Sequence, residues 1–144
     1  LLGEDKECVL CSTGRELVQP DGTPTGRVMG VKTRITLKDL EKQNWINCSS
    51  VVLKTEVAGE FLMEHDDSHE DYIMWLRILK KYGYALAVDE PLLKCRQSAG
   101  GKSRNKLKSA LMTWKVYRYV GYSFPKALYC FVCYTIAGCK KYYG

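Results

Sequence analysis

Residues 91–144 contain no aspartate and no glutamate, although they carry 11 lysines and arginines. Residues 1–90 hold another 11 basic side chains, but here all 16 acidic residues of the chain outnumber them. The net charge of +6 therefore arises wholly from the C-terminal segment. Such a one-sided basic segment favours anionic partners, namely phosphates, acidic membrane lipid or nucleic acid.

The chain also lacks an apolar run long enough to cross a bilayer, which takes about 20 residues. Its longest run, 127–139, is flanked by Lys126 and by the basic and aromatic residues 140–143. These flanks suit a helix that lies in the interface of a membrane. A terminal helix packed on its own domain has the same pattern, so the sequence leaves both hypotheses open.

The first five residues, Leu1 to Asp5, lack the basic and apolar segments of a signal peptide. The cysteines are odd in number and are Cys8, Cys11, Cys48, Cys95, Cys130, Cys133 and Cys139. Free thiols in a reducing cytosol are the simplest explanation, which predicts a cytoplasmic protein. Because the chain starts abruptly and without methionine, we also expect it to be cut from a longer protein.

Strand-like and helix-like segments alternate along the chain, which is typical of an α/β domain. We expect extended segments at 7–19, 48–53, 84–88 and 92–96. A tight turn is expected at Asp21-Gly22 and a second break at Thr25-Gly26. Helices are expected at 36–43, 69–82, 103–120 and 124–141. Thr36 followed by Asp39 resembles a capping pair at the start of the first of them.

The helix at 69–82 carries the clearest signals. Its apolar residues recur at helical spacing and are Tyr72, Ile73, Leu76 and Leu79. Acidic residues occupy its first turn and Lys80-Lys81 its last, which complements the helix dipole. Gly83 fits the position just after the C-terminus of the helix.

An acidic cluster, residues 64–71, precedes and opens this helix and holds five carboxylates and both histidines of the chain. Crowded carboxylates raise one another's pKa values. Asp71 lies in the first turn, and Trp75 follows four residues later on the same face. A base beside an aromatic ring suits sugar chemistry, because the ring can stack on the sugar. An acidic first turn is equally what the helix dipole alone favours.

Three segments follow one another in a fixed order: 44–53 (NWINCSSVVL), 69–79 (HEDYIMWLRIL) and 89–96 (DEPLLKCR). This order closely resembles the C-terminal half of family 2 glycosyltransferases with the GT-A fold. In that family an N-x-I-x-x-S-S-V strand precedes an E-D-Y-x-x-W-L-R helix, an E-P-L-x-x-Y-R strand and a Ser/Asn/Lys-rich loop. The resemblance covers about residues 21–108. It implies a partial GT-A-like mixed sheet with flanking helices and a C-terminal helical pair.

The resemblance also implies roles for individual residues. Asp71 matches the catalytic aspartate, which takes the proton from an acceptor hydroxyl in an inverting sugar transfer. Glu70 matches an acid that binds or orients the acceptor, and Trp75 matches an aromatic residue near the acceptor. Ser49 and Ser50 lie where the family's strand passes beneath the donor sugar.

Basic residues at the end of the last strand and in the following loop match groups that neutralise the leaving diphosphate. They are Arg96, Lys102 and Arg104. Arg77 matches a motif position that we interpret as structural. Cys95 replaces the usual aromatic residue of the strand, which weakens any role for that side chain.

The chain has no counterpart of the D-x-D motif that holds Mg²⁺ or Mn²⁺ on the nucleotide-sugar in this family. We therefore expect Mg²⁺ or Mn²⁺ in a full-length parent, no cofactor in this fragment, and no turnover by the fragment alone. The expected parts are 1–100, the C-terminal half of a GT-A-like catalytic domain, and 101–144, a basic helical tail. The partners implied are a nucleotide-sugar donor, a glycan or lipid-linked acceptor and the inner face of a membrane.

Three other hypotheses remain from the residues alone. His65 and His69, with the acids around them, could bind a metal ion if they shared a helix face. The pairs Cys8/Cys11 and Cys130/Cys133 have zinc-like internal spacing but lie far apart in the sequence. The basic tail, with aromatic residues among its lysines, could instead form a non-enzymatic domain that binds nucleic acid or anionic lipid, although no nucleic-acid motif is present.

Overall fold

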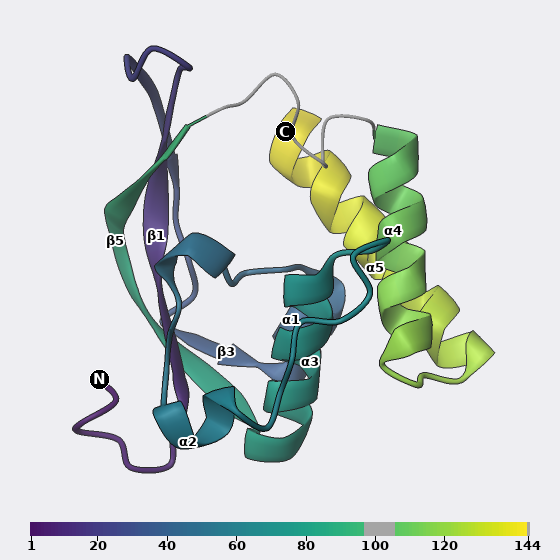
Figure 1. Ribbon diagram of the computed structural model, residues 1–144. Coiled ribbons are helices and arrows are strands. Elements are labelled where there is room, and N and C mark those ends of the chain that lie inside the picture. Colours follow the sequence, from purple (N-terminus) through teal and green to yellow (C-terminus); the bar gives the residue numbers. More distant parts are fainter. Residues whose placement is uncertain (97–105, 144) are drawn as a thin grey trace.

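The computed structural model describes residues 1–96 and 106–143. Its strands are β1 (Leu10–Val18), β2 (Pro24–Met29), β3 (Arg34–Thr36), β4 (Val52–Leu53) and β5 (Tyr84–Arg96). Its helices are α1 (Leu37–Lys42), the 3-10 turn η1 (Cys48–Ser50), α2 (Thr55–Ala58), α3 (Glu70–Tyr82), α4 (Lys106–Tyr119) and α5 (Phe124–Tyr143). Figure 1 shows the sheet on one side, the α4–α5 pair on the other, and α1 and α3 between them.

The sheet is mixed and has the strand order β2-β1-β5-β3, with β4 also paired to β1. The central strands β1 and β5 run parallel, whereas β2 and β4 pair with β1, and β3 pairs with β5, in antiparallel fashion. The α/β class, the mixed sheet, its flanking helices and the C-terminal helical pair are therefore as the sequence predicts.

Strand β5 is continuous, so the prediction of two separate strands around Pro91 is wrong. Its pairing with β1 moves from Thr13↔Val88 to Arg15↔Leu93, and the extra residues of β5 form a bulge. A bulge tolerates proline because residues there leave the hydrogen-bonded ladder. The bulge is held by Asp89, whose Oδ1 accepts a 2.8 Å hydrogen bond from the backbone N–H of Val31.

Two further predictions need correction. The expected strand at 48–53 is mostly the turn η1, and only the two residues of β4 pair with β1. The turn forms because the Ser50 hydroxyl accepts a hydrogen bond from the N–H of Thr13 at 3.2 Å and lies 3.1 Å from the carbonyl of Asn47. The expected break at Thr25-Gly26 lies inside β2, where Gly26 adopts a φ of 71°.

The turn at Gly22, the start of α1 and the end of α3 agree with the sequence-based predictions. The turn at Asp21-Gly22 joins β1 to β2, and Gly22 has the positive φ of 93° that glycine allows. Helix α1 opens with a capping box between Thr36 and Asp39. Helix α3 ends at Gly83, whose φ of 88° would strain any side chain.

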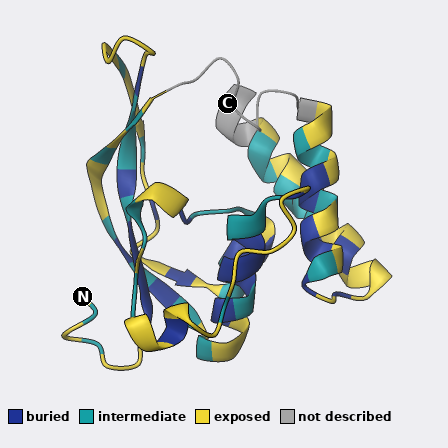
Figure 2. Ribbon diagram, viewed as in Figure 1, coloured by how far each residue is buried: buried dark blue, intermediate teal, exposed yellow. Residues whose placement is uncertain are grey.

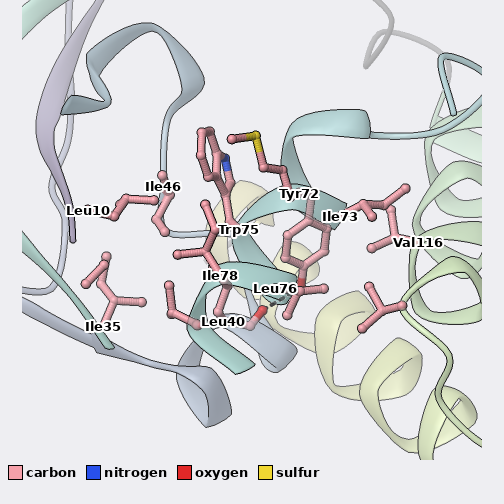
Figure 3. Packing of buried hydrophobic residues seen from close by; sticks show 14 of the residues in the cluster. Leu10, Ile35, Leu40, Ile46, Tyr72, Ile73, Trp75, Leu76, Ile78 and Val116 are labelled. Carbon is pink, nitrogen blue, oxygen red and sulfur yellow. Dashed lines mark hydrogen bonds between the residues drawn. The ribbon is translucent and has the colours of Figure 1, made fainter. Parts of the chain in front are cut away.

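Helix α3 forms the centre of the core, and seven of its residues are buried. Figure 2 shows this dark-blue helix between the sheet and the C-terminal helices. Figure 3 shows Trp75 on the side of α3 that faces Leu10 and Ile46, and Ile73 on the side that faces Val116. One helix therefore joins the sheet to the α4–α5 pair through apolar contacts on both sides.

A buried polar cluster, which we call the Glu41 cluster, joins the end of α1 to the other helices. The Glu41 side chain accepts a 2.7 Å hydrogen bond from the Tyr122 hydroxyl and pairs with Lys126 at 2.7 Å. The Glu41 carbonyl accepts a 2.9 Å bond from the hydroxyl of Tyr117 on α4. The hydroxyl of Tyr72 on α3 donates to the neighbouring Leu40 carbonyl at 2.5 Å. These bonds fix the position of α4 and α5 relative to α3.

We expect Tyr122→Phe to lower the free energy of unfolding by about 1.5–3 kcal/mol, the usual contribution of a hydrogen bond to a charged group. The measurement is urea unfolding followed by circular dichroism. Tyr129→Phe is the matched control, because Tyr129 is exposed on α5, the helix that follows Tyr122, and it should stay within about 0.5 kcal/mol of wild type. Equal midpoints for the two variants would contradict a stabilising role of the Glu41 cluster.

Candidate functional site

A cleft of about 540 Å³ lies where the sheet and the helices diverge. Its walls come from β1, the segment between α1 and η1, the start of α3, and the facing sides of α4 and α5. The volume falls within the range of about 300–1,000 Å³ that is usual for small-molecule sites. The cleft therefore brings together parts of the chain that the sequence separates by more than 100 residues, from Arg15 to Cys139.

Asp71 lines this cleft from the first turn of α3. Its Oδ1 accepts a 2.8 Å hydrogen bond from the N–H of Tyr72. Burial raises the pKa of the Asp71 carboxyl above its ordinary value, against the opposing effects of the Tyr72 N–H and of His69. The negative charge of Glu70 raises the pKa of Asp71 further. The carboxyl is thus a stronger base than an exposed aspartate and is still accessible from the cleft.

Polar side chains from several elements line the cleft together with Asp71. Arg15 lies on β1, and the side-chain amides of Gln43, Asn44 and Asn47 come from the segment after α1. Hydroxyl groups on α4 and α5 complete it and belong to Ser109, Thr113, Tyr134 and Thr135. Amides and hydroxyls that surround one carboxylate can recognise the hydroxyl groups of a sugar by hydrogen bonds.

Two carboxylates of the acidic cluster, Glu64 and Asp67, form ion pairs with neighbouring helices. Asp67 pairs with Lys115 at 2.5 Å and accepts a 3.1 Å bond from the Tyr119 hydroxyl, both from α4. Glu64 pairs with Arg77 at 3.1 Å, and this pair agrees with a structural role for the arginine. The loop before α3 is thereby tied to α4 and α3, whereas Asp71 faces the cleft.

The two histidines do not share a helix face. His65 stacks on Tyr119 with ring centroids 3.8 Å apart, and His69 Nε2 lies 3.3 Å from the hydroxyl of Ser109. Within residues 1–96 and 106–143, no group of three or more His, Cys, Asp and Glu side chains could hold a metal ion. All seven cysteines belong to the described residues and are free thiols.

Trp75 is placed differently from the expected aromatic platform. It is 2% exposed, packs in the core and is not a lining residue of the cleft. The i, i+4 spacing puts Trp75 below Asp71 on α3, but by that turn the helix has already entered the core. The sequence-based expectation that Trp75 stacks on an acceptor sugar is therefore corrected: its ring is buried in the core.

The other expected acceptor and donor contacts are not lining residues of the cleft. Glu70 is half-buried beside Asp71, Ser49 is exposed in η1, and Ser50 is engaged with β1 through the bonds described above. Partial burial raises the pKa of the Cys48 thiol in the same turn, and the charges of Asp71 and Glu70 at the start of α3 raise it further.

The expected diphosphate-binding residues are only partly described. Arg96 is exposed at the end of β5, where it pairs in register with Val18. Lys102 and Arg104 lie outside the described residues, so their predicted role stays a prediction.

Arg15, Asn44 and Asn47 are cleft residues that the sequence reasoning missed. The two asparagines both occur within the segment that carries the family resemblance, where Asn44 matches the asparagine of N-x-I-x-x-S-S-V and Asn47 falls on an unspecified position. Arg15 had a weaker signal, because it is a single basic residue in a strand and is followed directly by the acidic Glu16.

The chain is similar in sequence to a curated protein. Over 138 residues, or 95% of the chain, it is 33% identical to the Bacillus subtilis (strain 168) protein named "Putative teichuronic acid biosynthesis glycosyltransferase TuaG". The chain is a homologue of this glycosyltransferase. It spans 55% of the length of TuaG, about half of the relative it matches. No protein-family model and no solved structure gives a significant match.

We expect Asp71→Asn to be at least as stable as wild type at pH 7. A carboxyl with a raised pKa in the folded state costs stability once the pH rises through that pKa, and the amide removes this cost. The two proteins should have equal urea midpoints below about pH 3.8, the ordinary value for aspartate, and the variant should gain an advantage as the pH rises to 7.

Asp39→Asn is the matched control with the opposite sign. Burial of Asp39 is outweighed by hydrogen bonds from Lys32 and Thr36, so its pKa lies below the ordinary value. Its ionised form stabilises the fold, and the variant should lose stability at pH 7 and approach wild type as the pH falls. An Asp71→Asn variant that behaves like Asp39→Asn would show that Asp71 is held ionised by its neighbours.

Proposed function

We propose that this chain is the acceptor-side part of an inverting GT-A glycosyltransferase in which Asp71 is the catalytic base. The observation that carries the proposal is the half-buried carboxyl of Asp71, with its raised pKa, on the wall of the large cleft. The homology to TuaG supports sugar transfer in general. The family resemblance supports the finer assignment of base, fold and stereochemistry.

In the proposed reaction, the Asp71 carboxylate accepts the proton of an acceptor hydroxyl. The hydroxyl oxygen forms a bond to the anomeric carbon of the donor sugar from the face opposite the nucleoside diphosphate. The bond from that carbon to the diphosphate oxygen breaks, and its electron pair leaves with the diphosphate. Attack from the opposite face inverts the configuration of the anomeric carbon. A raised pKa helps because proton transfer to a stronger base is more favourable.

The acceptor would be held by the polar wall around the base. Gln43, Asn44 and Asn47 offer amide donors and acceptors for its hydroxyl groups. Glu70, next to Asp71, would tune and orient the base through its charge. Exposed Ser49 is the better placed of the two serines for a donor contact, because the hydroxyl of Ser50 is already hydrogen-bonded.

The donor would be a nucleotide-sugar whose leaving diphosphate is neutralised by Arg96, Lys102 and Arg104. The described residues lack a cluster that fits Mg²⁺ or Mn²⁺. We infer that residues outside this chain bind any metal on the diphosphate in the parent protein. The name of TuaG points to teichuronic acid biosynthesis. For this chain we propose a role in the assembly of a surface polysaccharide, with a glycan or lipid-linked acceptor.

We also propose that the chain binds a membrane through an exposed face of α5. This face would lie on the anionic inner surface of the membrane. Its apolar stripe is spaced by four residues and consists of Phe124, Leu128, Val132 and Ile136. Residues 91–144 add 11 basic side chains and no acid, which complements anionic lipid headgroups. In the described part of the chain, no helix is long and apolar enough to cross a membrane.

Replacing Asp71 by Asn should lower sugar transfer by the natural protein that contains these residues about 10²- to 10⁴-fold, because the base is lost. The measurement is release of nucleoside diphosphate from a panel of nucleotide-sugars with isolated cell-surface glycans as acceptors. Asp67→Asn is the control, since it removes a carboxylate of the same acidic cluster outside the cleft, and it should keep most of the rate. Equal rates for both variants would exclude Asp71 as the base.

The 144-residue chain alone should release no nucleoside diphosphate above background in the same assay with Mg²⁺ or Mn²⁺. The physical reason is the lack of a metal-binding cluster in the described residues. A clear rate that disappears in Asp71→Asn would show that these residues bind the donor without help.

Ile136→Glu should weaken binding of the chain to phosphatidylglycerol vesicles roughly tenfold, because it replaces an apolar contact with a charge. Co-sedimentation with these vesicles, compared with neutral phosphatidylcholine vesicles, measures the effect. Ser123→Glu adds the same charge beside the stripe and should change binding little. Failure to bind anionic vesicles, together with a shift of duplex DNA or RNA in a gel, would favour nucleic acid as the partner.

A further inference from the structure

Arg15 is a half-buried cation on the cleft wall that has no partner among the described residues. Its Nε is buried and makes no hydrogen bond. No carboxylate of the described residues lies within ion-pair distance of its guanidinium. A guanidinium keeps its charge at any physiological pH, and buried donors without partners are rare because they cost free energy. The position of Arg15 therefore calls for an explanation.

Asn47 carries a second donor of this kind. Its Nδ2 is buried and unpaired, and the residue lines the same cleft. Two further buried polar atoms lack partners, Ser12 Oγ and Trp75 Nε1, but neither residue lines the cleft. The unpaired atoms at the cleft are thus both N–H donors, and one of them belongs to a cation.

A small cavity of about 20 Å³ adjoins Arg15 and Asn47 on the side of β2. It has room for one water molecule, which can accept a hydrogen bond from Nε. The terminal nitrogens of the guanidinium carry four more N–H groups, in a planar arrangement that matches two oxygens of a carboxylate or phosphate. The terminal nitrogens are not among the buried unpaired atoms. They are therefore open to the solvent of the cleft, where an oxyanion can take the place of water.

We propose that Arg15 and Asn47 bind an oxyanion, a carboxylate or a phosphate, on the sugar ligand of the Asp71 cleft. Arg15 and Asp71 are the charged residues among the lining residues, apart from His69. Arg15 offsets the repulsion between an anionic ligand and the Asp71 carboxylate and leaves that carboxylate free for a hydroxyl. The role of Asp71 toward the bound sugar rests on the function proposed above, whereas the binding of the oxyanion needs no turnover.

The test is a binding titration by protein NMR with three probes: methyl glucoside, methyl glucuronide and glucose 6-phosphate. At low salt, at least one anionic sugar should bind the wild-type chain about tenfold or more tightly than the neutral sugar, because hydrogen bonds to charged groups are strong. The better of the two anions identifies the group as carboxylate or phosphate. Arg15→Gln should abolish the preference.

Arg27→Gln is the matched control, since Arg27 is exposed on the neighbouring strand β2 and its removal should keep the preference. The urea midpoint of Arg15→Gln should equal or exceed that of wild type, because the change removes an unpaired buried donor. A lowered midpoint would instead assign Arg15 a structural role and overturn the proposal.

Equal binding of all three sugars by wild type, or a preference that survives in Arg15→Gln, would also overturn it. Asp71→Asn separates this proposal from the catalytic one. The variant should lose sugar transfer in the natural protein and keep the preference for the anionic sugar. If only the transfer experiment failed, the proposed oxyanion site would stand. If only the binding titration failed, the proposed catalytic role of Asp71 would stand.

Discussion

The burial of α3 on two sides is the constraint on which the rest of the structure depends. The helix packs against the sheet through residues such as Trp75 and against α4 through residues such as Ile73. Its first turn therefore lies at the boundary between the core and the cleft. A carboxyl at the start of a helix in open water would be an ordinary surface acid. Here the same group is half-buried, and burial raises its pKa.

Features encoded by neighbouring residues could be predicted from the sequence. The capping box at Thr36, the turn at Gly22 and the end of α3 at Gly83 all depend on contacts within a few positions. The place of Asp71 in the first turn of α3 follows from the same kind of signal. The ordered motifs added the correct class of fold, and the homology to TuaG agrees with the activity class that they implied.

Features that depend on distant contacts could not be predicted. Helical spacing puts Trp75 on the face of Asp71, but whether that face meets solvent or core is decided by the sheet. Pro91 breaks the strand pattern, yet Asp89 and Val31 stabilise a bulge that keeps β5 continuous. Arg15 becomes a candidate binding residue only because the segment with Asn44 and Asn47, about 30 residues later, lines the same cavity. The division of the chain at residue 100 stays a prediction.

The parallel pairing of β1 with β5 has a consequence for how the chain folds. Cys11 pairs with Leu86, so the centre of the sheet joins residues 75 positions apart. Closing a loop of this length costs conformational entropy before the strands gain their hydrogen bonds. Chains with many non-local contacts therefore fold slowly. The hairpin of β1 and β2 and helix α3 are local and can form early. We expect the central pair to form after these local elements, because it has the larger loop to close.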